Sequence, residues 1–472
     1  MRFTVVTIDN LPDDVLLAIF DFYVVPLQDL YFFDGLYDTI RKKWSWHSLV
    51  HVCRRWRSLV FASPRRLNLR LCCMTKTPAR STLDVWPALP LLILGDVSEL
   101  LVDNVVAELE HSDRIHQISL RCHTTSQIEK LWTAMRAPFP ELVTLNLSMS
   151  VGRSYYGPVL PDSILGGSAP SLRFFALDSV PFPGLPGLLL STTHLVVLLL
   201  YDIPHSGYIS PEALATSLSM LTSLETLLLE FESPLSCPDQ ENRRSPPPTR
   251  SVLPALTDFS FKGVNEYLEE LVARIDTPQL FQSEATFFND IDFDISELIR
   301  FASRSSTFKA PNEAYVAFGI LTASVKLRRQ ASNVEYFEVK ISCKESGWQL
   351  SSLAQISTAS LPLLSTTENL YIYERVGSQL DWKNGIENIE WLELLLPFTA
   401  VKNLYLSKQF APRIAPTLQE MAASGTTEVL SSLQNLYLEG FQSSESVQEG
   451  IKLFISARPV AISVWDRDSA RE

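Results

Sequence analysis

Two groups of side chains in this sequence have a spacing that suits metal coordination. His47 and His51 are four residues apart, so on a helix both imidazoles would face one side, as zinc ligands do. No glutamate follows His47 and no third ligand is apparent, so we interpret both as helix-surface histidines. Asp290, Asp292 and Asp294 are spaced like the start of a calcium loop. Isoleucine and phenylalanine replace the glycine and glutamate of such a loop, which favours an ordinary strand-to-helix turn.

The sequence patterns of nucleotide binding and nucleophilic catalysis are incomplete. Gly152 and Gly157 have the spacing of a phosphate loop, but Pro158 and Val159 replace its lysine and its serine or threonine. No Gly-x-Ser-x-Gly turn occurs, and Cys53 lies on the apolar face of a predicted helix, where a thiol is packed rather than nucleophilic. The sequence therefore predicts no catalytic residue, no metal site, no cofactor and no enzyme activity of its own.

The composition is that of a folded, water-soluble protein. Of the 472 residues, 46% are hydrophobic and 20% are charged. A formal net charge of −13 argues against nucleic-acid binding, which requires an excess of lysine and arginine. The six cysteines form no CxxC pair, as expected in a reducing compartment. Because no signal peptide and no membrane-spanning stretch is apparent, we expect a cytoplasmic or nuclear location and no membrane partner.

The N-terminal part of the chain carries two helical patterns and a strand pattern. Residues 11–14 (Leu-Pro-Asp-Asp) suit a helix start, because proline and acidic residues are favoured in the first turn. The second helix is predicted from about Trp46 to Val60, with Arg54, Arg55 and Arg57 on its solvated side. A strand is predicted after Pro64, where leucines alternate with polar residues over residues 67–71.

The two helical strings together resemble the F-box. Its pattern is a Leu-Pro-acidic helix start followed by a Leu-x-x-Val-Cys-Arg-x-Trp helix, and residues 11–20 and 49–57 match it in order. The chain also resembles the F-box proteins that are abundant in mushroom-forming fungi. One departure is the stretch from Val25 to Trp44, which is longer than the loop usually found there.

The resemblance implies a helical module over residues 1–64 that packs against an SKP-type adaptor and, through it, a cullin ubiquitin ligase. Nine residues would contact the adaptor or form the small core behind it: Leu11, Pro12, Val15, Leu16, Ile19, Phe20, Leu49, Val52 and Trp56. So many large apolar side chains cannot all be buried within so short a segment, which independently favours a partner site. The alternative is a plain helical cap on a repeat array.

The rest of the chain, residues 65–472, repeats one short motif of the form apolar-x-x-apolar-x-apolar. Up to Leu256 the copies recur at intervals of 23 to 32 residues, a range typical of repeat architectures, and the gap of 78 residues from Leu256 to Val334 leaves room for two degenerate copies. The clearest copies are Ile115/Ile118/Leu120, Leu142/Leu145/Leu147, Leu172/Phe175/Leu177, Leu195/Leu198/Leu200, Leu224/Leu227/Leu229, Leu256/Phe259/Phe261, Val334/Phe337/Val339, Val401/Leu404/Leu406 and Leu433/Leu436/Leu438, with a weaker copy at Leu370 and Ile372.

Helical patterns lie between these copies and begin near Pro211, Asn265 and Ile295. The fold class predicted is an α/β repeat, a leucine-rich-repeat-like curved solenoid with parallel strands on its concave face. Further strands are expected over residues 280–288 and 313–320. The alternative, a doubly wound α/β sheet, needs a glycine-rich nucleotide loop or a switch-point site, and neither is apparent.

Two further segments of the repeat region stand out. Residues 233–252 are rich in proline and charge, which predicts an exposed loop between repeats. Ser245 follows two arginines and precedes proline, so it is either a phosphorylation site or an ordinary exposed serine. A helix followed by a strand over residues 444–466 is predicted to cap the array and to cover its last open edge.

A candidate partner surface follows from the register of the repeats. Parallel stacking would place Tyr371, Tyr405 and Tyr437 side by side, and these three residues are called the tyrosine row. Tyrosine supplies a large amphipathic contact area and is enriched in interface hot spots. With Tyr373, Glu338 and Glu439 the row would form part of a recognition surface, or its rings would only stack along the sheet.

The favoured function is therefore that of a substrate-recognition subunit of an SKP-cullin-F-box ubiquitin ligase, with the repeats holding an unknown target protein. Such a subunit would raise the effective concentration of the target at the ligase and would need no catalytic side chain of its own. One rival is a repeat scaffold that binds the adaptor without a role in ubiquitination. A second, from another class, is an unrecognised enzyme, which would need clustered catalytic side chains in a deep pocket.

Overall fold

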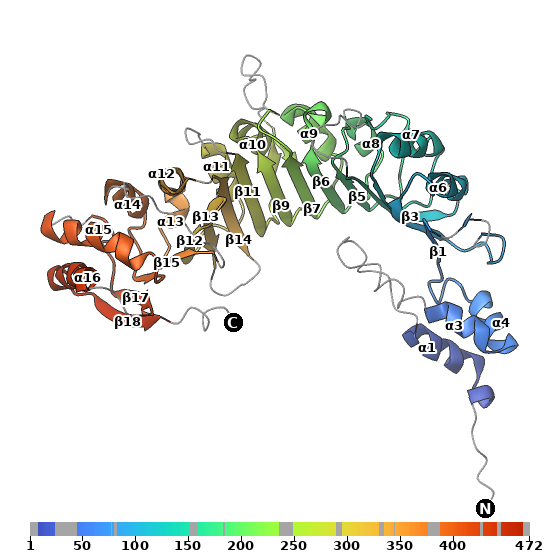
Figure 1. Cartoon of the computed structure of the whole chain (residues 1–472), viewed down its shortest axis with the longest axis horizontal. Coiled ribbons are helices and arrows are strands. Elements are labelled where there is room, and N and C mark those ends of the chain that lie inside the picture. The colour runs from blue at the N-terminus through green and yellow to red at the C-terminus, as the bar shows by residue number, and fades with distance from the viewer. Residues whose placement is uncertain are drawn as a thin grey trace, which may run out of the picture. The chain divides into compact units, whose positions relative to one another are not determined.

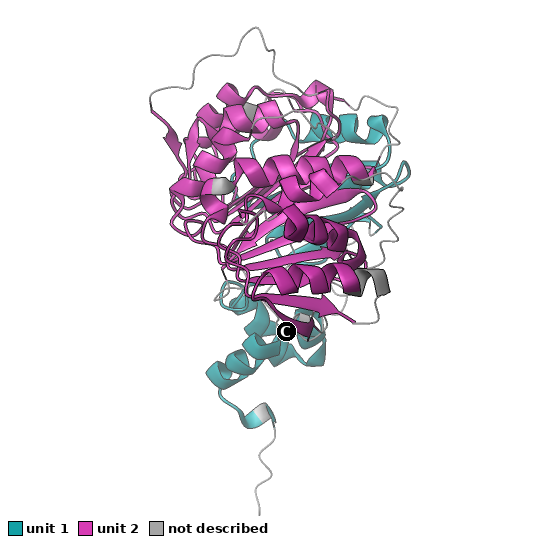
Figure 2. Ribbon diagram, turned by 90° about the vertical axis from the view of Figure 1, so that its left-hand side faces the viewer, with its two compact units in different colours: residues 1–145 teal, residues 146–472 magenta. Residues whose placement is uncertain are grey.

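The structure is a computed structural model. It describes residues 8–23, 45–76, 78–79, 83–150, 158–182, 185–235, 249–288, 295–329, 335–343, 345–375, 388–424, 428–440 and 445–465. The contacts within the chain divide it into two compact units, residues 1–145 and 146–472 (Figure 2). The boundary predicted between residues 64 and 65 lies inside the first unit, which therefore holds the helical module and the first strands of the repeats.

In the described residues of the first unit, helices α1, α3 and α4 pack on one another, and parallel strands follow them. Strand β2 lies between β1 and β3, and helix α6 packs against both β2 and α7. The elements are α1 (Asp13–Tyr23), α3 (Ser45–Val52), α4 (Arg54–Ala62), β1 (Leu71–Met74), β2 (Leu91–Val97), α6 (Val102–Leu109), β3 (Ile115–Cys122) and α7 (Thr125–Ala134).

Two local predictions for the first unit were wrong. The helix expected from Trp46 to Val60 is broken at Cys53, whose extended backbone (φ −155°, ψ 171°) separates α3 from α4. The Cys53 sulfur accepts a hydrogen bond from the backbone N–H of Trp56 at 3.4 Å, so this residue caps α4. The strand expected over residues 67–71 is instead a turn in which Asn68 has a φ of 47°, and β1 begins only at Leu71.

The second unit alternates strands and helices. Strand β4 (Thr144–Met149) spans the division between the units. The elements that follow are β5 (Phe174–Asp178), α8 (Leu185–Leu189), β6 (Val197–Ile203), α9 (Pro211–Leu218), β7 (Thr226–Phe231), β8 (Ser251–Val252), β9 (Asp258–Gly263), α10 (Asn265–Val272), β10 (Ile275–Asp276), β11 (Gln282–Phe288), α11 (Ser296–Arg304), β12 (Glu313–Phe318), β13 (Thr322–Arg328), β14 (Tyr336–Ser342), α12 (Ser346–Ala359), α13 (Leu361–Leu364), β15 (Asn369–Glu374), α14 (Asn388–Leu395), β16 (Asn403–Leu406), α15 (Ala411–Ser424), β17 (Asn435–Glu439), α16 (Glu445–Ala457) and β18 (Ala461–Trp465).

The large sheet of this unit is mostly parallel, as the repeat pattern predicts, but one segment is not. Its strands from β5 onward follow the order β5-β6-β7-β9-β11-β14-β13-β12-β15-β16-β17-β18. Strand β13 is antiparallel to both β12 and β14, so the prediction of an all-parallel array was wrong here. The chain turns back through β13 and places β14, not β12, beside β11. Strand β12 pairs with β15 instead.

The two faces of the sheet differ because side chains alternate along a strand. In β7, Leu227, Leu229 and Phe231 are buried, while Thr226, Leu228 and Glu230 between them are half-buried. Helix α10 packs against both α9 and α11, and the three helices lie along one side of the sheet (Figure 1). The sheet face that carries the half-buried residues is called the open face. The molecule is thus an α/β repeat with a large parallel sheet.

Several predicted features lie outside the described residues, namely Asp290, Asp292, Asp294, Gly152, Gly157, Ser245 and the stretch from Val25 to Trp44. The predicted helix starts near Pro211, Asn265 and Ile295 are confirmed by α9, α10 and α11. The terminal helix and strand are α16 and β18. Within the described part of the chain, no helix has both the length and the apolar character needed to cross a membrane.

Candidate functional site

The helical module has a small core of its own. Leu16, Phe20 and Leu49 are buried, with 0%, 1% and 6% of their surface exposed. The ring of Trp56 lies 4.7 Å from that of Phe20, which joins α4 to α1. Four of the nine residues predicted for the adaptor contact therefore face inward or pack on the module's interior, where they hold the helices in place.

An arginine fixes the start of α1. The Arg55 guanidinium donates to the carboxylate of Asp13, with atoms 2.5 Å and 3.1 Å apart, and to the backbone carbonyl of Leu11 at 2.6 Å. A planar guanidinium is suited to this kind of double contact. Arg57 likewise donates to the carbonyl of Val50 at 2.9 Å. The prediction of a solvated arginine face holds for the exposed Arg57 and only in part for the half-buried Arg55, although both residues link helices.

The outer surface of α1 carries an exposed apolar stripe. Val15, Ile19 and Phe22 are 39%, 41% and 92% exposed, and their spacing places them on one side of the helix. Val52 on α3 is 58% exposed, Pro12 is also exposed and Leu11 is half-buried. Phe22 was missed from the sequence, although its position seven residues after Val15 is a signal for the same side of the helix.

Aromatic rings attach α3 to the segment that precedes β2. Trp46 stacks on His47 at 3.8 Å and meets the edge of Trp86 at 5.5 Å, and its indole N–H donates to the Arg70 carbonyl. Burial, followed by the nearby His51, lowers the pKa of His47 to about 4. The interpretation as a surface histidine holds for the exposed His51 and was wrong for His47, which is packed between rings.

On the second unit, the tyrosine row forms as the repeat register predicts. Tyr371 pairs with Tyr405, and Tyr405 with Tyr437, on adjacent parallel strands. Their rings stack with centroids 4.3 Å apart in both pairs and with interplanar angles of 13° and 8°. Tyr315 on β12 extends the stack at 4.6 Å from Tyr371, a neighbour hidden from the sequence by the reversed strand order.

A second ladder of side chains runs beside the tyrosines on the same face. The Asn403 amide donates to the side-chain oxygen of Asn369, and the Asn435 amide donates to that of Asn403, both at 2.8 Å. The signal that could have revealed this ladder is the tripeptide Asn-Leu-Tyr, which recurs at residues 369, 403 and 435. The two ladders together fix the register of β15, β16 and β17.

One end of the stack makes polar contacts, and an indole lies beside two of its middle rings. Tyr315 donates to the carboxylate of Glu313 at 2.9 Å and accepts from Arg328 at 2.8 Å. The ring of Trp465 on β18 lies 5.5 Å from Tyr405 and 6.0 Å from Tyr371. Burial, followed by the neighbouring Tyr405, raises the pKa of Tyr371, so its hydroxyl stays protonated under physiological conditions.

The remaining predicted surface residues are held in ionic contacts and ring contacts. Glu338 is only 7% exposed and lies 3.2 Å from the Arg375 guanidinium and 3.7 Å from Lys340. Glu439 accepts a hydrogen bond from the backbone N–H of Lys408 at 3.1 Å. Tyr373 meets the ring of Tyr315 edge-on at 6.5 Å. Glu338 therefore offers little surface to a partner, whereas the tyrosine row remains half-exposed.

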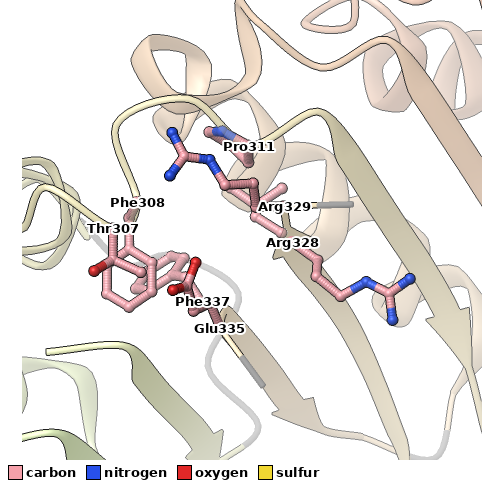
Figure 3. A pocket seen from close by; sticks show the side chains of 8 residues that line it. Thr307, Phe308, Pro311, Arg328, Arg329, Glu335 and Phe337 are labelled. Atoms are coloured by element: carbon pink, nitrogen blue, oxygen red, sulfur yellow. The ribbon is translucent and has the colours of Figure 1, made fainter. Parts of the chain in front are cut away.

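Neither a cluster of metal-binding side chains nor the hollow beside Phe308 provides a ligand site among the described residues. No group of three or more His, Cys, Asp or Glu side chains in the described ranges is placed to hold a metal ion. A hollow of about 10 Å³ is lined by Phe308 and Phe337 among other residues. Figure 3 shows that the guanidinium groups of Arg328 and Arg329, which also line it, point to opposite sides. This volume admits about one water molecule.

Comparisons with known proteins add little to this geometry. No protein-family model matches the chain, and no curated protein matches it. Among solved structures, the chain is similar to the leucine-rich repeat-containing protein LegL7 from Legionella pneumophila, with 11% sequence identity. The alignment covers 83% of this chain and 98% of that one, with a TM-score of 0.28.

Proposed function

We propose that this chain is the substrate-recognition subunit of a ubiquitin ligase built on an SKP-type adaptor and a cullin. The α1, α3 and α4 module would dock on the adaptor, and the open face of the repeat sheet would hold the target. One observation carries the proposal beyond the F-box resemblance: Val15, Ile19 and Phe22 form an exposed apolar stripe on a helix whose other side is buried.

The stripe is poorly explained as a simple cap on the array. A cap presents a polar outer surface to water, whereas this helix exposes a large aromatic ring and two aliphatic side chains. Contiguous exposed apolar groups of this kind usually mark a protein contact. Pro12, Val15, Ile19 and Val52 are exposed and could touch the adaptor, with Phe22 added to them. Leu16, Phe20 and Leu49 would act by fixing the helices.

The repeats would contribute only the binding of the target protein. Holding a target beside a ubiquitin-charged enzyme raises the effective concentration of its lysines, and this needs no catalytic side chain in the receptor. The tyrosine row suits such binding, because stacked rings lose little conformational freedom when a partner covers them. We assign no catalytic role to any residue of this chain.

The test is co-purification of the full chain with a purified SKP-type adaptor. The variant V15S/I19S/F22S should fail to co-elute, because truncating buried hot-spot side chains costs about 2 kcal/mol or more each, near thirty-fold in affinity. Leu100→Ser is the matched control, since Leu100 is 93% exposed in the same unit but belongs to the turn between β2 and α6 and not to α1. Circular dichroism should show the same helix content in all three proteins.

The outcomes separate the alternatives. If wild-type chain does not bind the adaptor while folded, or if the triple variant binds as well as wild type, the proposal fails and the module is a cap. Binding without any change in the turnover of captured proteins would leave an adaptor-bound scaffold instead of a ligase receptor.

A further inference from the structure

The open face contains a hollow of about 150 Å³ that lies away from the tyrosine row. It crosses β7, β9, β11 and the start of β14. Its lining residues are Thr226, Leu227, Leu228, Asp258, Phe259, Ser260, Gln282, Glu284 and Tyr336. All belong to the second unit, so the site does not depend on the placement of the helical module.

The hollow exists because one side chain in a row of larger ones is short. Leu228, Ser260 and Glu284 are register partners on adjacent strands, and the serine leaves space between the leucine and the glutamate. The volume is close to that of an engineered protein cavity that binds benzene. It therefore has room for one large side chain from a partner.

The charges of the lining are of one sign. Asp258 and Glu284 supply two carboxylates, and none of the lining residues is basic. Two described lysines contact lining residues of the hollow. Lys340 lies 2.5 Å from Glu284 and 3.7 Å from Glu338, and Lys326 lies 3.7 Å above the Tyr336 ring. Lys340 pairs with one oxygen of Glu284, Oε1, so the Asp258 carboxylate and the Oε2 atom of Glu284 are left to meet a positive group that enters from solvent.

The pKa of Tyr336 is consistent with a negative environment. Burial, followed by the carboxylates of Glu284, Glu338 and Asp258, raises the pKa of this hydroxyl. The hydroxyl thus remains protonated.

An apolar shelf adjoins the hollow on the same face. Val197, Tyr201 and Leu228 are partly buried and pack against Phe174, Ala176 and Leu199. Leu228 belongs to both the shelf and the lining of the hollow, so the two surfaces are continuous. A segment that placed an apolar side chain on the shelf would carry its next residues directly over the carboxylates.

We propose that this hollow binds an arginine side chain of an extended target segment, with a neighbouring apolar side chain of that segment on the shelf. The aliphatic part of arginine would pack against Leu228. Its planar guanidinium presents several donors at once and matches carboxylates better than the point charge of lysine. The inference rests on the proposed role of the repeats in holding a target, and it is independent of the adaptor.

The experiment is selection of short random peptides, displayed on phage, against the immobilised full-length chain without adaptor. The enriched peptides should share an arginine close to an apolar residue. Replacing that arginine by glutamine in a synthetic copy should weaken binding about tenfold or more, or about 1.4 kcal/mol. The same replacement should have a smaller effect on binding to a Glu284→Gln variant, because one of the two carboxylate partners of the arginine is already absent.

A substitution that fills the hollow with a larger side chain provides a second test of peptide binding. Ser260→Leu should abolish binding of the selected peptide. The matched control is Ser463→Leu, which lies on β18 next to Tyr437 in the same open-face row. Glu368→Gln is the charge control, since this carboxylate also pairs with a lysine, Lys402 at 2.6 Å, outside the hollow.

Three results would overturn the inference: no enriched peptide, enriched peptides without a shared arginine, or unchanged binding to Ser260→Leu. If the chain bound the selected peptide but not the adaptor, only the proposed ubiquitin-ligase role would be contradicted. The two proposals therefore fail in distinguishable ways.

Discussion

At the scale of single residues, Glu108 is the most unusual titratable group of the first unit. It is fully buried on α6, and one of its carboxyl oxygens has no hydrogen-bond partner among the described residues. The other accepts from the Asn104 amide at 3.3 Å. Burial raises the pKa of Glu108 to about 8, although the contact with Asn104 opposes the shift. This carboxyl is therefore protonated in the folded protein at neutral pH.

The raised pKa predicts a loss of stability as the pH increases. The folded pKa is above the unfolded value of 4.5, so the stabilising contribution is complete below about pH 4.5 and disappears as the pH rises towards 8. Glu108→Gln should remove this dependence and stabilise the protein at pH 8 by on the order of 3 kcal/mol. Urea unfolding of both proteins across this pH range is the measurement.

The control for this prediction is Glu110→Gln. Glu110 is exposed just after the same helix, so the variant changes the charge equally without altering the interior. Parallel stability curves for wild type and Glu108→Gln would mean that the Glu108 carboxyl is not the group responsible.

At the scale of elements, the asparagine ladder holds β15, β16 and β17 together through side chains as well as backbone. Asn403 is the central member and takes part in both side-chain hydrogen bonds of the ladder. A buried or half-buried amide that loses its partner costs more than the net value of the bond, because it is no longer solvated.

Asn403→Ala should therefore loosen these strands locally. The expected loss is about 1–3 kcal/mol, from two hydrogen bonds and two partners left incompletely satisfied. Hydrogen exchange at the amides of β16 and β17 measures this local opening directly. Asn388→Ala, which removes one exposed hydrogen bond to Glu420, should leave exchange in these strands unchanged. Equal exchange in the Asn403 variant and wild type would show that the ladder adds nothing to the backbone pairing.

The sequence predicted the strands of the repeats well because the motif repeats the buried side of each strand. Phe259 and Phe261 are buried in β9, and the same positions are buried in each described copy. Since the motif also sets the register, the alignment of Tyr371, Tyr405 and Tyr437 follows from its spacing alone. The pattern identifies which residues of a strand are buried, and this information was sufficient to predict the tyrosine row.

The pattern does not reveal in which direction a strand runs or where a helix is interrupted. In β13, Ala323, Val325 and Leu327 alternate as in any strand, and nothing in that alternation distinguishes antiparallel from parallel pairing. The helical spacing likewise continues from α3 into α4 although Cys53 interrupts the hydrogen bonds. Tyr315 was missed because its place beside Tyr371 depends on the reversed strand order, whereas the asparagine ladder was open to prediction from the recurring Asn-Leu-Tyr.

At the scale of the whole molecule, the proposed function assigns separate tasks to separate parts of the chain. The apolar stripe lies on α1 in the first unit, and the tyrosine row lies on β15 to β17 in the second. No residue is shared between them, so each surface should be removable without loss of the other.

A complementation experiment tests this separation. In cells lacking the chain, the proteins that accumulate should return to normal abundance with wild type, but not with V15S/I19S/F22S or with Y371S/Y405S/Y437S. The tyrosine variant should still co-elute with the adaptor, whereas the stripe variant should not. Full rescue by the tyrosine variant would mean that the row only stacks along the sheet.

The reversed hairpin of β12, β13 and β14 also has a consequence for how the chain assembles. In a regular repeat array, folding spreads from one repeat to its sequence neighbour, because each repeat packs against the one before it. Here β12, the next strand in the sequence, does not pair with β11. The outer edge of β11 can pair only after the chain has passed through β13 and formed β14. We therefore expect folding to pause after β11, and the segments before and after the hairpin to nucleate as two cooperative blocks that join last at β12, β13 and β14.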